Sequence, residues 1–246
     1  MKACVLASGS KGNSTYIEAG NHKILIDIGI SFKDLKERCS HIDVCVDDID
    51  TLLITHSHSD HTKGLLQFSK NTNADIYMSD KTYDELGMDI DYISIKDEFM
   101  IDDVSITTIS LSHDVECIGY IIEYSGNSIV YVTDTGYINE KYYEVLKDRT
   151  VYIFESNHDI EMNLNSRKPE KYRRRVVSDI GHLSNKQASY YLSKIVGNNT
   201  KCIILAHLSE EDNKSSLALD ELNKSVPSNI NRMVAYQKNE TDIIEV

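Results

Sequence analysis

The alternation of apolar and polar positions predicts short strands and helices that follow one another in both halves of the chain. Residues 120–134 have the pattern of a hairpin that turns at residues 125–128, and most of residues 92–133 resemble strand. The other apolar runs with the length of buried strands are residues 3–7, 15–19, 23–28, 51–55, 75–78, 151–155 and 202–206. Such alternation is typical of an α/β fold, and we expect an αβ/βα sandwich.

Capping residues and helical spacing predict where the main helices begin. Ser31, with Asp34 three residues later, predicts a helix over residues 31–39. Ser184 with Gln187 predicts another helix, whose apolar face would consist of Ala188, Tyr191, Leu192 and Ile195. The remaining helical stretches that the pattern indicates are residues 62–70 and 139–147.

The chain of 246 residues has no repeat, linker or low-complexity tract, so we expect a single domain over residues 1–246. No apolar run approaches the ~18 residues of a membrane span, so we expect no membrane association. The apolar run at residues 3–7 is too short for a signal-peptide core. Five scattered cysteines without a CxxC pair favour reduced thiols and a cytoplasmic location. Nothing in the pattern predicts an oligomeric state.

A net charge of −13 argues against loose binding of nucleic acid or of an anionic membrane. The segment "RKPEKYRRR", residues 167–175, is a local exception with six basic side chains. It is either an ordinary solvated face or a track along which a phosphate backbone binds.

The stretch "THSHSDH", residues 55–61, holds three of the nine histidines and an aspartate directly after an apolar strand. Neutral imidazole and carboxylate are the ligands that a divalent metal such as zinc prefers. His56 and His58 would share one face of an extended backbone. Asp60 and His61 lie one turn further, where a second ion could bind. A structural zinc site would favour cysteines, and none lies nearby, so the stretch predicts a catalytic metal site.

This H-x-H-x-D-H pattern after an apolar strand resembles the signature of the metallo-β-lactamase fold superfamily. The resemblance implies a four-layer αβ/βα sandwich with a metal cleft at the edge of its two sheets. It also implies three further ligands at strand ends, which we identify as His113 in "SLSHD", Asp134 in "YVTDTG" and His207 in "ILAHLS". Asp27 in "LIDIG" matches an aspartate that supports the site without binding metal.

On this resemblance we expect two divalent ions, zinc or manganese with iron possible, and a bridging hydroxide that Asp60 orients. The expected ligands of one ion are His56, His58 and His113. Those of the other ion are Asp60, His61 and His207, with Asp134 as the bridge. His182 in "DIGHLSN" competes with His207 for the last position. We favour His207 because it follows five apolar strand residues.

Five other polar side chains are candidates for substrate binding. His182 precedes a predicted helix, where a phosphate would be stabilised, and it is also the candidate proton donor. His158 follows the strand at residues 151–155 and is either a substrate contact or a plain loop residue. Ser8, Ser10 and Asn13 lie in the loop "ASGSKGNS", whose backbone N–H groups can point toward an anion, although an ordinary hairpin loop has the same composition.

The segments "LASGSKGNSTYIE", "LIDIGIS", "ITHSHSDHTKGL", "ESNHDIEM", "GHLSN" and "AHLS" together resemble the YycJ/WalJ group of the superfamily. That resemblance implies a metal-dependent phosphodiesterase with DNA as its substrate, and more narrowly a 5′→3′ exonuclease on double-stranded DNA. The first alternative is a hydrolase of the same fold that acts on a cyclic phosphodiester, a thioester or a lactam. The second is a metal-binding regulator without catalytic activity.

Overall fold

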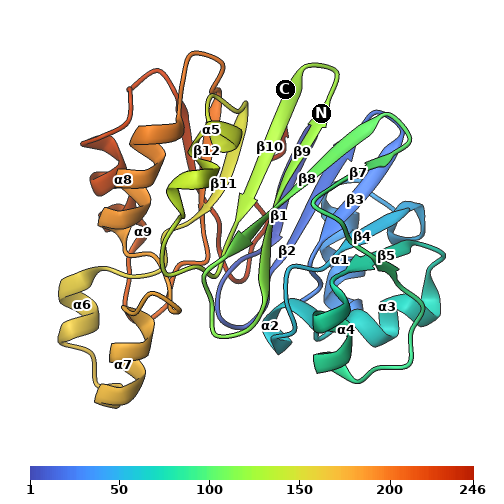
Figure 1. Cartoon of the computed structure of the whole chain (residues 1–246), viewed down its shortest axis with the longest axis horizontal. Helices are drawn as coiled ribbons and strands as arrows, with labels where there is room; N and C mark the ends of the chain where they lie inside the picture. Colours follow the sequence, from blue (N-terminus) through green and yellow to red (C-terminus); the bar gives the residue numbers. More distant parts are fainter. The chain divides into compact units, whose positions relative to one another are not determined.

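The computed structural model describes all residues, 1–246 (Figure 1). The chain divides into two compact units. The first comprises Met1–Thr108, Glu123–Gly126 and Tyr236–Val246, and the second comprises Ile109–Ile122 and Asn127–Ala235. The single domain over residues 1–246 therefore stays a prediction. None of the helices combines the length and the hydropathy that a bilayer span requires.

The first sheet has seven strands, and its early strands are antiparallel while β3 to β6 run parallel. Most of these strands are buried because their residues are apolar on both faces, as parallel sheets require. Their order is β14 (Ile244–Glu245), β1 (Lys2–Ala7), β2 (Ser14–Ala19), β3 (His22–Ile26), β4 (Thr51–Leu53), β5 (Asp75–Met78) and β6 (Ile93–Ser94).

The helices of the first unit cover an apolar core that includes Leu25, Leu52 and Phe68. Ser31 caps the first of them by accepting a hydrogen bond from the Asp34 N–H, as predicted. The helix predicted over residues 62–70 is instead two short helices, and one helix was not predicted. These elements are α1 (Phe32–His41), η1 (Val46–Asp48), α2 (Ser59–Thr62), α3 (Leu65–Asn71) and α4 (Asp80–Leu86).

The second sheet also has seven strands, of which β10 to β13 run parallel. Ser125 and Gly126 make the predicted hairpin turn with positive φ angles of 50° and 80°. The turn is two residues long, shorter than the predicted residues 125–128, because β10 already begins at Asn127. The order is β13 (Asn231–Val234), β12 (Cys202–Ala206), β11 (Val151–Glu155), β10 (Asn127–Val132), β9 (Cys117–Tyr124), β8 (Val104–Leu111) and β7 (Glu98–Ile101).

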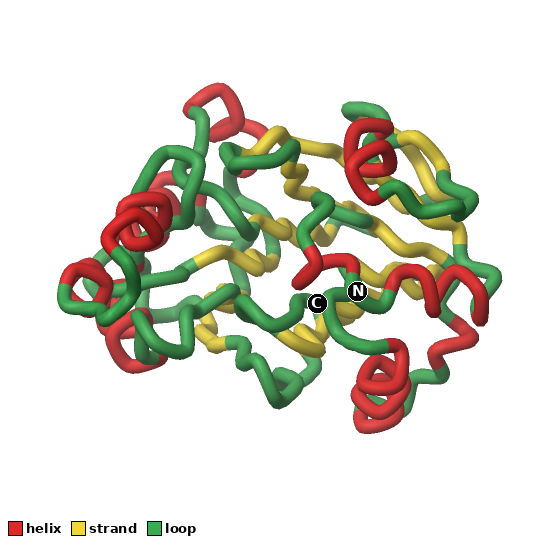
Figure 2. The backbone as a smooth tube through the Cα atoms, turned by 90° about the horizontal axis from the view of Figure 1, so that it is seen from below, coloured by secondary structure: helices red, strands yellow, loops and turns green.

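The helices of the second unit pack on a core that includes Phe154, Leu192 and Leu205. Ser184 and Gln187 form a complete capping box at the start of α8, as predicted. These helices are η2 (Glu140–Tyr142), α5 (Tyr143–Leu146), α6 (Ile160–Leu164), α7 (Glu170–Val176), α8 (Asn185–Ile195) and α9 (Ser215–Asn223). Figure 2 shows that long loops connect the strands and helices, and such loops commonly carry binding residues.

Three predicted site residues lie just past strand ends in the left-handed region of the backbone. Asp27, Asp134 and His207 have φ angles of 60°, 61° and 55°, and they follow β3, β10 and β12. Residues other than glycine rarely adopt this conformation, and it is maintained only where the surroundings hold it. The fold therefore stores backbone strain at these positions.

Gly29 tests how closely the segment after β3 approaches the histidine-bearing turn. A Cβ at this residue would lie 1.6 Å from the carbonyl oxygen of Asp60. We expect Gly29→Ala to lower the free energy of unfolding by about 4 kcal/mol or more, because backbone must move. Gly87→Ala is the control. Its Cβ meets nothing within 4 Å, and only its φ of 58° would cost about 1 kcal/mol. Equal losses of unfolding free energy in the two variants, measured by urea unfolding, would contradict the close approach of Gly29 to Asp60.

Candidate metal centre

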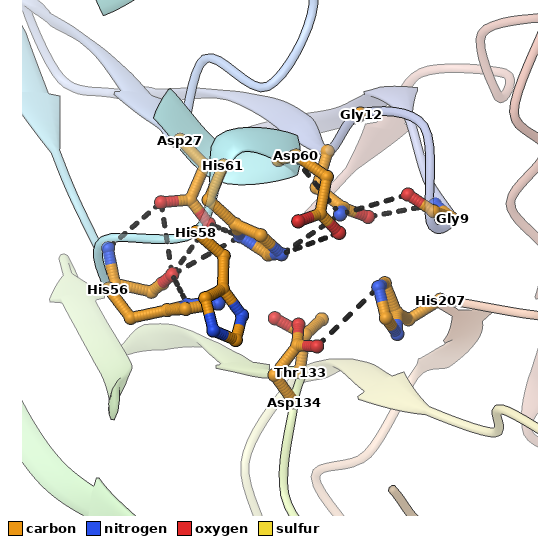
Figure 3. A network of polar contacts seen from close by, with 12 residues as sticks. Gly9, Gly12, Asp27, His56, His58, Asp60, His61, Thr133, Asp134 and His207 are labelled. Carbon is orange, nitrogen blue, oxygen red and sulfur yellow. Dashed lines mark hydrogen bonds and ion pairs between the residues drawn. The ribbon is translucent and has the colours of Figure 1, made fainter. Parts of the chain in front are cut away.

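The predicted turn of the first unit places its histidine rings against one another (Figure 3). The ring centroid of His56 lies 4.7 Å from that of His58 and 4.1 Å from that of His61. His58 has extended backbone angles and is the N-cap residue of α2, so Asp60 and His61 belong to the first turn of a helix. The change from strand to helix predicted at this point is confirmed.

Backbone hydrogen bonds tie this turn to two neighbouring segments of the first unit. The N–H of Asn13 donates to the carbonyl of Asp60 at 2.7 Å, and the N–H of Ile28 donates to the carbonyl of His61 at 2.8 Å. Gly29 in turn donates to the carbonyl of Asn13 at 2.8 Å. The segments "ASGSKGNS" and "LIDIGIS" therefore fix the position of the turn.

Asp27 is a fully buried carboxylate that organises the histidines of this turn. It accepts hydrogen bonds from the N–H and the hydroxyl of Thr55 and from Nδ1 of His61 at 2.7 Å (Figure 3). The Thr55 hydroxyl also lies 2.9 Å from Nδ1 of His56. Because both Nδ1 atoms face acceptors, the hydrogen-bond network assigns the proton to Nδ1 and the lone pair to Nε2 in each ring.

Within the second unit, two predicted histidine ligands lie close to the third predicted ligand, an aspartate. His113, Asp134 and His207 follow the ends of β8, β10 and β12. Oδ1 of Asp134 lies 4.0 Å from Nε2 of His113 and 3.6 Å from Nε2 of His207. The side chains of all three are almost completely buried. The structure brings these three side chains together inside this unit, and their role as metal ligands stays a prediction.

Glu155, at the end of β11, is a second fully buried carboxylate and was not predicted. It accepts hydrogen bonds from Nδ1 of His182 at 2.8 Å and from Nδ1 of His207 at 3.1 Å. The N–H groups of Thr135 and Leu183 also donate to it. Burial alone would raise the pKa of this carboxyl, but the charge of His182 and these hydrogen bonds lower it well below its usual range. Glu155 is therefore ionised at neutral pH.

The same proton placement recurs at His113. Its Nδ1 lies 3.3 Å from the carbonyl oxygen of Gly181, which can only accept, so the lone pair again belongs to Nε2. Burial lowers the pKa of His113, although Asp134 opposes the shift. The histidines whose Nδ1 atoms face hydrogen-bond acceptors in this way are His56, His61, His113, His182 and His207.

These features fit divalent metal ions. Metal-binding histidines typically donate one ring N–H to a carboxylate, carbonyl or similar acceptor, which directs the other nitrogen to the metal. In the second unit, Asp134, Glu155, His182 and His207 each offer a ligand atom within 4.8 Å of the others. Both His182 and His207 belong to this group, so the geometry does not decide between them as the last ligand.

The predicted substrate residues occupy different environments. The N–H of Ser8 donates to the carbonyl of Tyr236, whereas Ser10 is exposed. Asn13 is buried. Its side-chain oxygen accepts from the N–H of Gly9, and its side-chain nitrogen donates to the carbonyl of Gly9 and lies 3.0 Å from Nε2 of His61. These contacts give Asn13 a role in holding the loop. Substrate binding by Ser8, Ser10 and Asn13 stays a prediction.

His158 is almost completely buried, and its Nδ1 has no hydrogen-bond partner. Burial lowers its pKa to about 4, so the ring is neutral at pH 7. Its backbone carbonyl accepts from the N–H of Asn185 at the start of α8. A role in substrate binding stays a prediction for His158 as well.

The basic segment at residues 167–175 forms much of α7, and three of its six charges are paired with carboxylates. Lys168 contacts Asp212 at 2.8 Å, Arg174 contacts Glu170, and Arg175 contacts Asp114. Arg173 donates to the backbone carbonyl of Leu164 and, like Arg167 and Lys171, forms no ion pair. Three cations of the segment therefore stay available to a phosphate backbone, and binding of phosphate by this segment stays a prediction.

Comparison with known proteins identifies the family to which this chain belongs. Residues 22–207 match the family model described as Beta-lactamase superfamily domain. The chain belongs to the beta-lactamase superfamily. Two mixed sheets flanked by helices give it the α/β sandwich fold of that superfamily.

Two relatives in the superfamily are similar over most of their length. Exodeoxyribonuclease YycJ of Bacillus anthracis is 33% identical over 223 residues, which are 87% of this chain and 84% of that protein. Exodeoxyribonuclease WalJ of Streptococcus pneumoniae is 33% identical over 229 residues, with coverages of 88% and 85%. Among solved structures, the metallo-beta-lactamase fold protein YhfI of Bacillus subtilis aligns with a TM-score of 0.76 at 15% identity, over 98% of both chains. That last similarity concerns the fold.

The buried carboxylates Asp27 and Glu155 should matter for metal binding because they orient histidines that are candidate metal ligands. Asp27→Asn and Glu155→Gln keep the shape and remove the charge, and we expect each to weaken metal affinity about 10–100-fold. Competition with a chelating dye measures the affinity. Glu18→Gln, which removes a carboxylate paired with Lys2, is the control and should leave it unchanged. Unaltered affinity in both site variants would refute the orienting role.

His158 should make stability depend on pH. Its pKa is about 4 in the folded chain, against an ordinary histidine pKa of 6.5. Between these values the unfolded state binds more protons, so stability falls as pH decreases from about 6.5 to 4. His158→Gln should flatten this part of the profile. Urea unfolding at steps between pH 7 and 4.5, in the presence of chelator, checks the slope. Parallel profiles for the two proteins would show that His158 does not titrate as a buried neutral ring.

Proposed function

We propose that this chain is a metal-dependent phosphodiesterase, and more narrowly a cytoplasmic exodeoxyribonuclease that digests double-stranded DNA from its 5′ ends. Two relatives named exodeoxyribonucleases support it, at 33% identity over 84–85% of their own lengths. The observation that carries the proposal is the shared hydrogen-bond arrangement of the five site histidines, whose Nδ1 atoms each face an acceptor, which suits metal ligands and not an ordinary polar core.

The proposed cofactors are two divalent ions, zinc or manganese, with iron as a further possibility. Imidazole and carboxylate ligands accept all three. When bound, such ions polarise phosphoryl oxygens and lower the pKa of coordinated water. The residues proposed to hold them are His56, His58, Asp60, His61, His113, Asp134 and His207.

Asp60 is the residue proposed to orient the attacking water and accept its proton. Its side chain remains 24% exposed, whereas the His61 ring next to it is fully buried. Its Oδ2 lies 3.7 Å from Nε2 of His61. An accessible carboxylate beside a buried ligand-type imidazole is suited to receive a proton at the surface of the site.

His182 is the residue proposed to protonate the leaving oxygen. Its Nδ1–H donates to the ionised Glu155, so Nε2 is the atom from which a proton can pass to substrate. The side chain of His182 is 10% exposed, more than that of His207 at 2%.

A direct test uses end-labelled duplex and single-stranded DNA with manganese, with zinc and with chelator. We expect products shortened from the 5′ end of the duplex, and none with chelator. Asp60→Ala should lower the rate by about 10²–10⁴-fold, as for loss of a general base. Asp84→Ala, which removes an exposed carboxylate on α4, should retain activity.

The alternatives give different results in this test. Cleavage of bis(p-nitrophenyl) phosphate without cleavage of DNA would indicate a hydrolase of small phosphodiesters. Cleavage of a thioester alone would remove phosphodiester chemistry from the proposal. A regulator without catalysis would keep its partner interaction in Asp60→Ala and show no turnover in any of these assays.

A further inference from the structure

The second unit contains a cavity of about 170 Å³ next to the loops that carry His113 and Asp134. It lies between the end of β8 and the segment that leads from β10 into α5. Its lining combines hydroxyl groups, one amide, two phenol rings and a single charged side chain. The lining residues are Ser110, Leu111, Ser112, Tyr137, Asn139, Lys141 and Tyr142.

Lys141 gives this cavity a positive charge that no carboxylate of its lining cancels. Its ammonium group forms no salt bridge and lies 4.7 Å from the ring centroid of Tyr142. Lys168 of the basic segment contrasts with it, because that ammonium contacts both Asp212 and Glu211. In a chain with a net charge of −13, an unpaired cation at a cavity favours an anionic ligand.

Hydrogen bonds hold the walls of the cavity in place. The N–H of Gly136 donates to the carbonyl of Ser112 at 2.9 Å, and the N–H of Ser112 donates to the hydroxyl of Thr135 at 3.1 Å. On the opposite wall, the N–H of Ser110 donates to the phenol oxygen of Tyr142 at 3.0 Å. Ser112 directly precedes His113, so the lining of the cavity is continuous in sequence with a proposed metal ligand.

Tyr137 supplies an aromatic surface at the mouth of the cavity. Its side chain is 39% exposed, whereas most tyrosine rings of the core are fully buried. A volume of about 170 Å³ is below the ~300–1,000 Å³ of pockets that enclose a drug-sized molecule. It suits a phosphate and part of a sugar, with a base left outside to stack on an exposed ring.

We propose that this cavity binds one nucleotide of a DNA substrate, with its phosphate at Lys141 and its base against Tyr137. This subsite rests on the proposed phosphodiesterase function and deepens it. The hydroxyls of Ser110 and Ser112 and the amide of Asn139 supply donors and acceptors for the sugar and phosphate oxygens. The site recognises a phosphate and an aromatic face, so it accepts any of the four bases.

Equilibrium dialysis of the full chain with radiolabelled thymidine 5′-monophosphate and thymidine tests the subsite, in chelator and in manganese. The wild-type chain should bind the monophosphate more tightly than the nucleoside. Lys141→Gln should weaken the monophosphate about tenfold and leave thymidine unchanged, because it removes one charge-assisted contact. Tyr137→Ala should weaken both ligands by a similar factor.

Kinetics on duplex DNA supply the second measurement. Lys141→Gln should raise KM about tenfold while kcat stays within about twofold, because the lysine binds substrate and moves no proton. The matched control is Lys147→Gln, which removes an exposed lysine of the same segment that lines no cavity. It should behave as wild type in both assays.

The outcomes separate this subsite from the proposed function. DNA cleavage with unaltered binding and KM in Lys141→Gln would overturn the subsite and leave the nuclease assignment intact. Lys141-dependent binding of the monophosphate without any DNA cleavage would support the nucleotide site and overturn the nuclease assignment.

Discussion

The site depends on one constraint: buried acceptors decide which nitrogen of each histidine ring carries the proton. Asp27 accepts a hydrogen bond from Nδ1 of His61 in the first unit, and Glu155 accepts hydrogen bonds from Nδ1 of His182 and of His207 in the second. If either carboxylate were replaced by an apolar group, the rings could rotate or exchange tautomers, and their Nε2 lone pairs would no longer be directed. The ligand set is therefore defined by the carboxylates behind it as much as by the histidines.

Two buried carboxylates would destabilise the fold unless their hydrogen bonds were satisfied. The backbone provides part of that satisfaction, because the N–H of Thr55 donates to Asp27 and the N–H groups of Thr135 and Leu183 donate to Glu155. Thr55 and Thr135 lie just past the ends of β4 and β10, and Leu183 lies just before α8, so the N–H groups of all three are outside sheet pairing and available. Asp27, Asp134 and His207 also lie just past strand ends, in left-handed conformations, so backbone strain and the buried charge of Asp27 coincide at the end of β3.

The sequence predicted the elements that carry a strong local signal. The histidine turn, the strand ends at His113, Asp134 and His207, and the capping box of α8 all follow from short-range patterns, and the structure contains them. The missed α4 had such a signal too, since Ser79 caps its start and Gly87 ends it in the left-handed conformation. Glu155 had none, because a glutamate after an apolar strand reads as solvent-facing until the fold surrounds it with His182 and His207.

The pairing of charges in the basic segment could not be predicted from the sequence. Counting basic residues in a window ignores acidic partners that the fold brings from elsewhere. Asp114 and Asp212 lie far from α7 in sequence, yet they pair with Arg175 and Lys168. Three of the six cations at residues 167–175 are thereby paired, whereas Lys141 forms no salt bridge. Neutralisation of a DNA phosphate would therefore draw on Lys141 and on the unpaired members of the basic segment, together with the proposed metal ions.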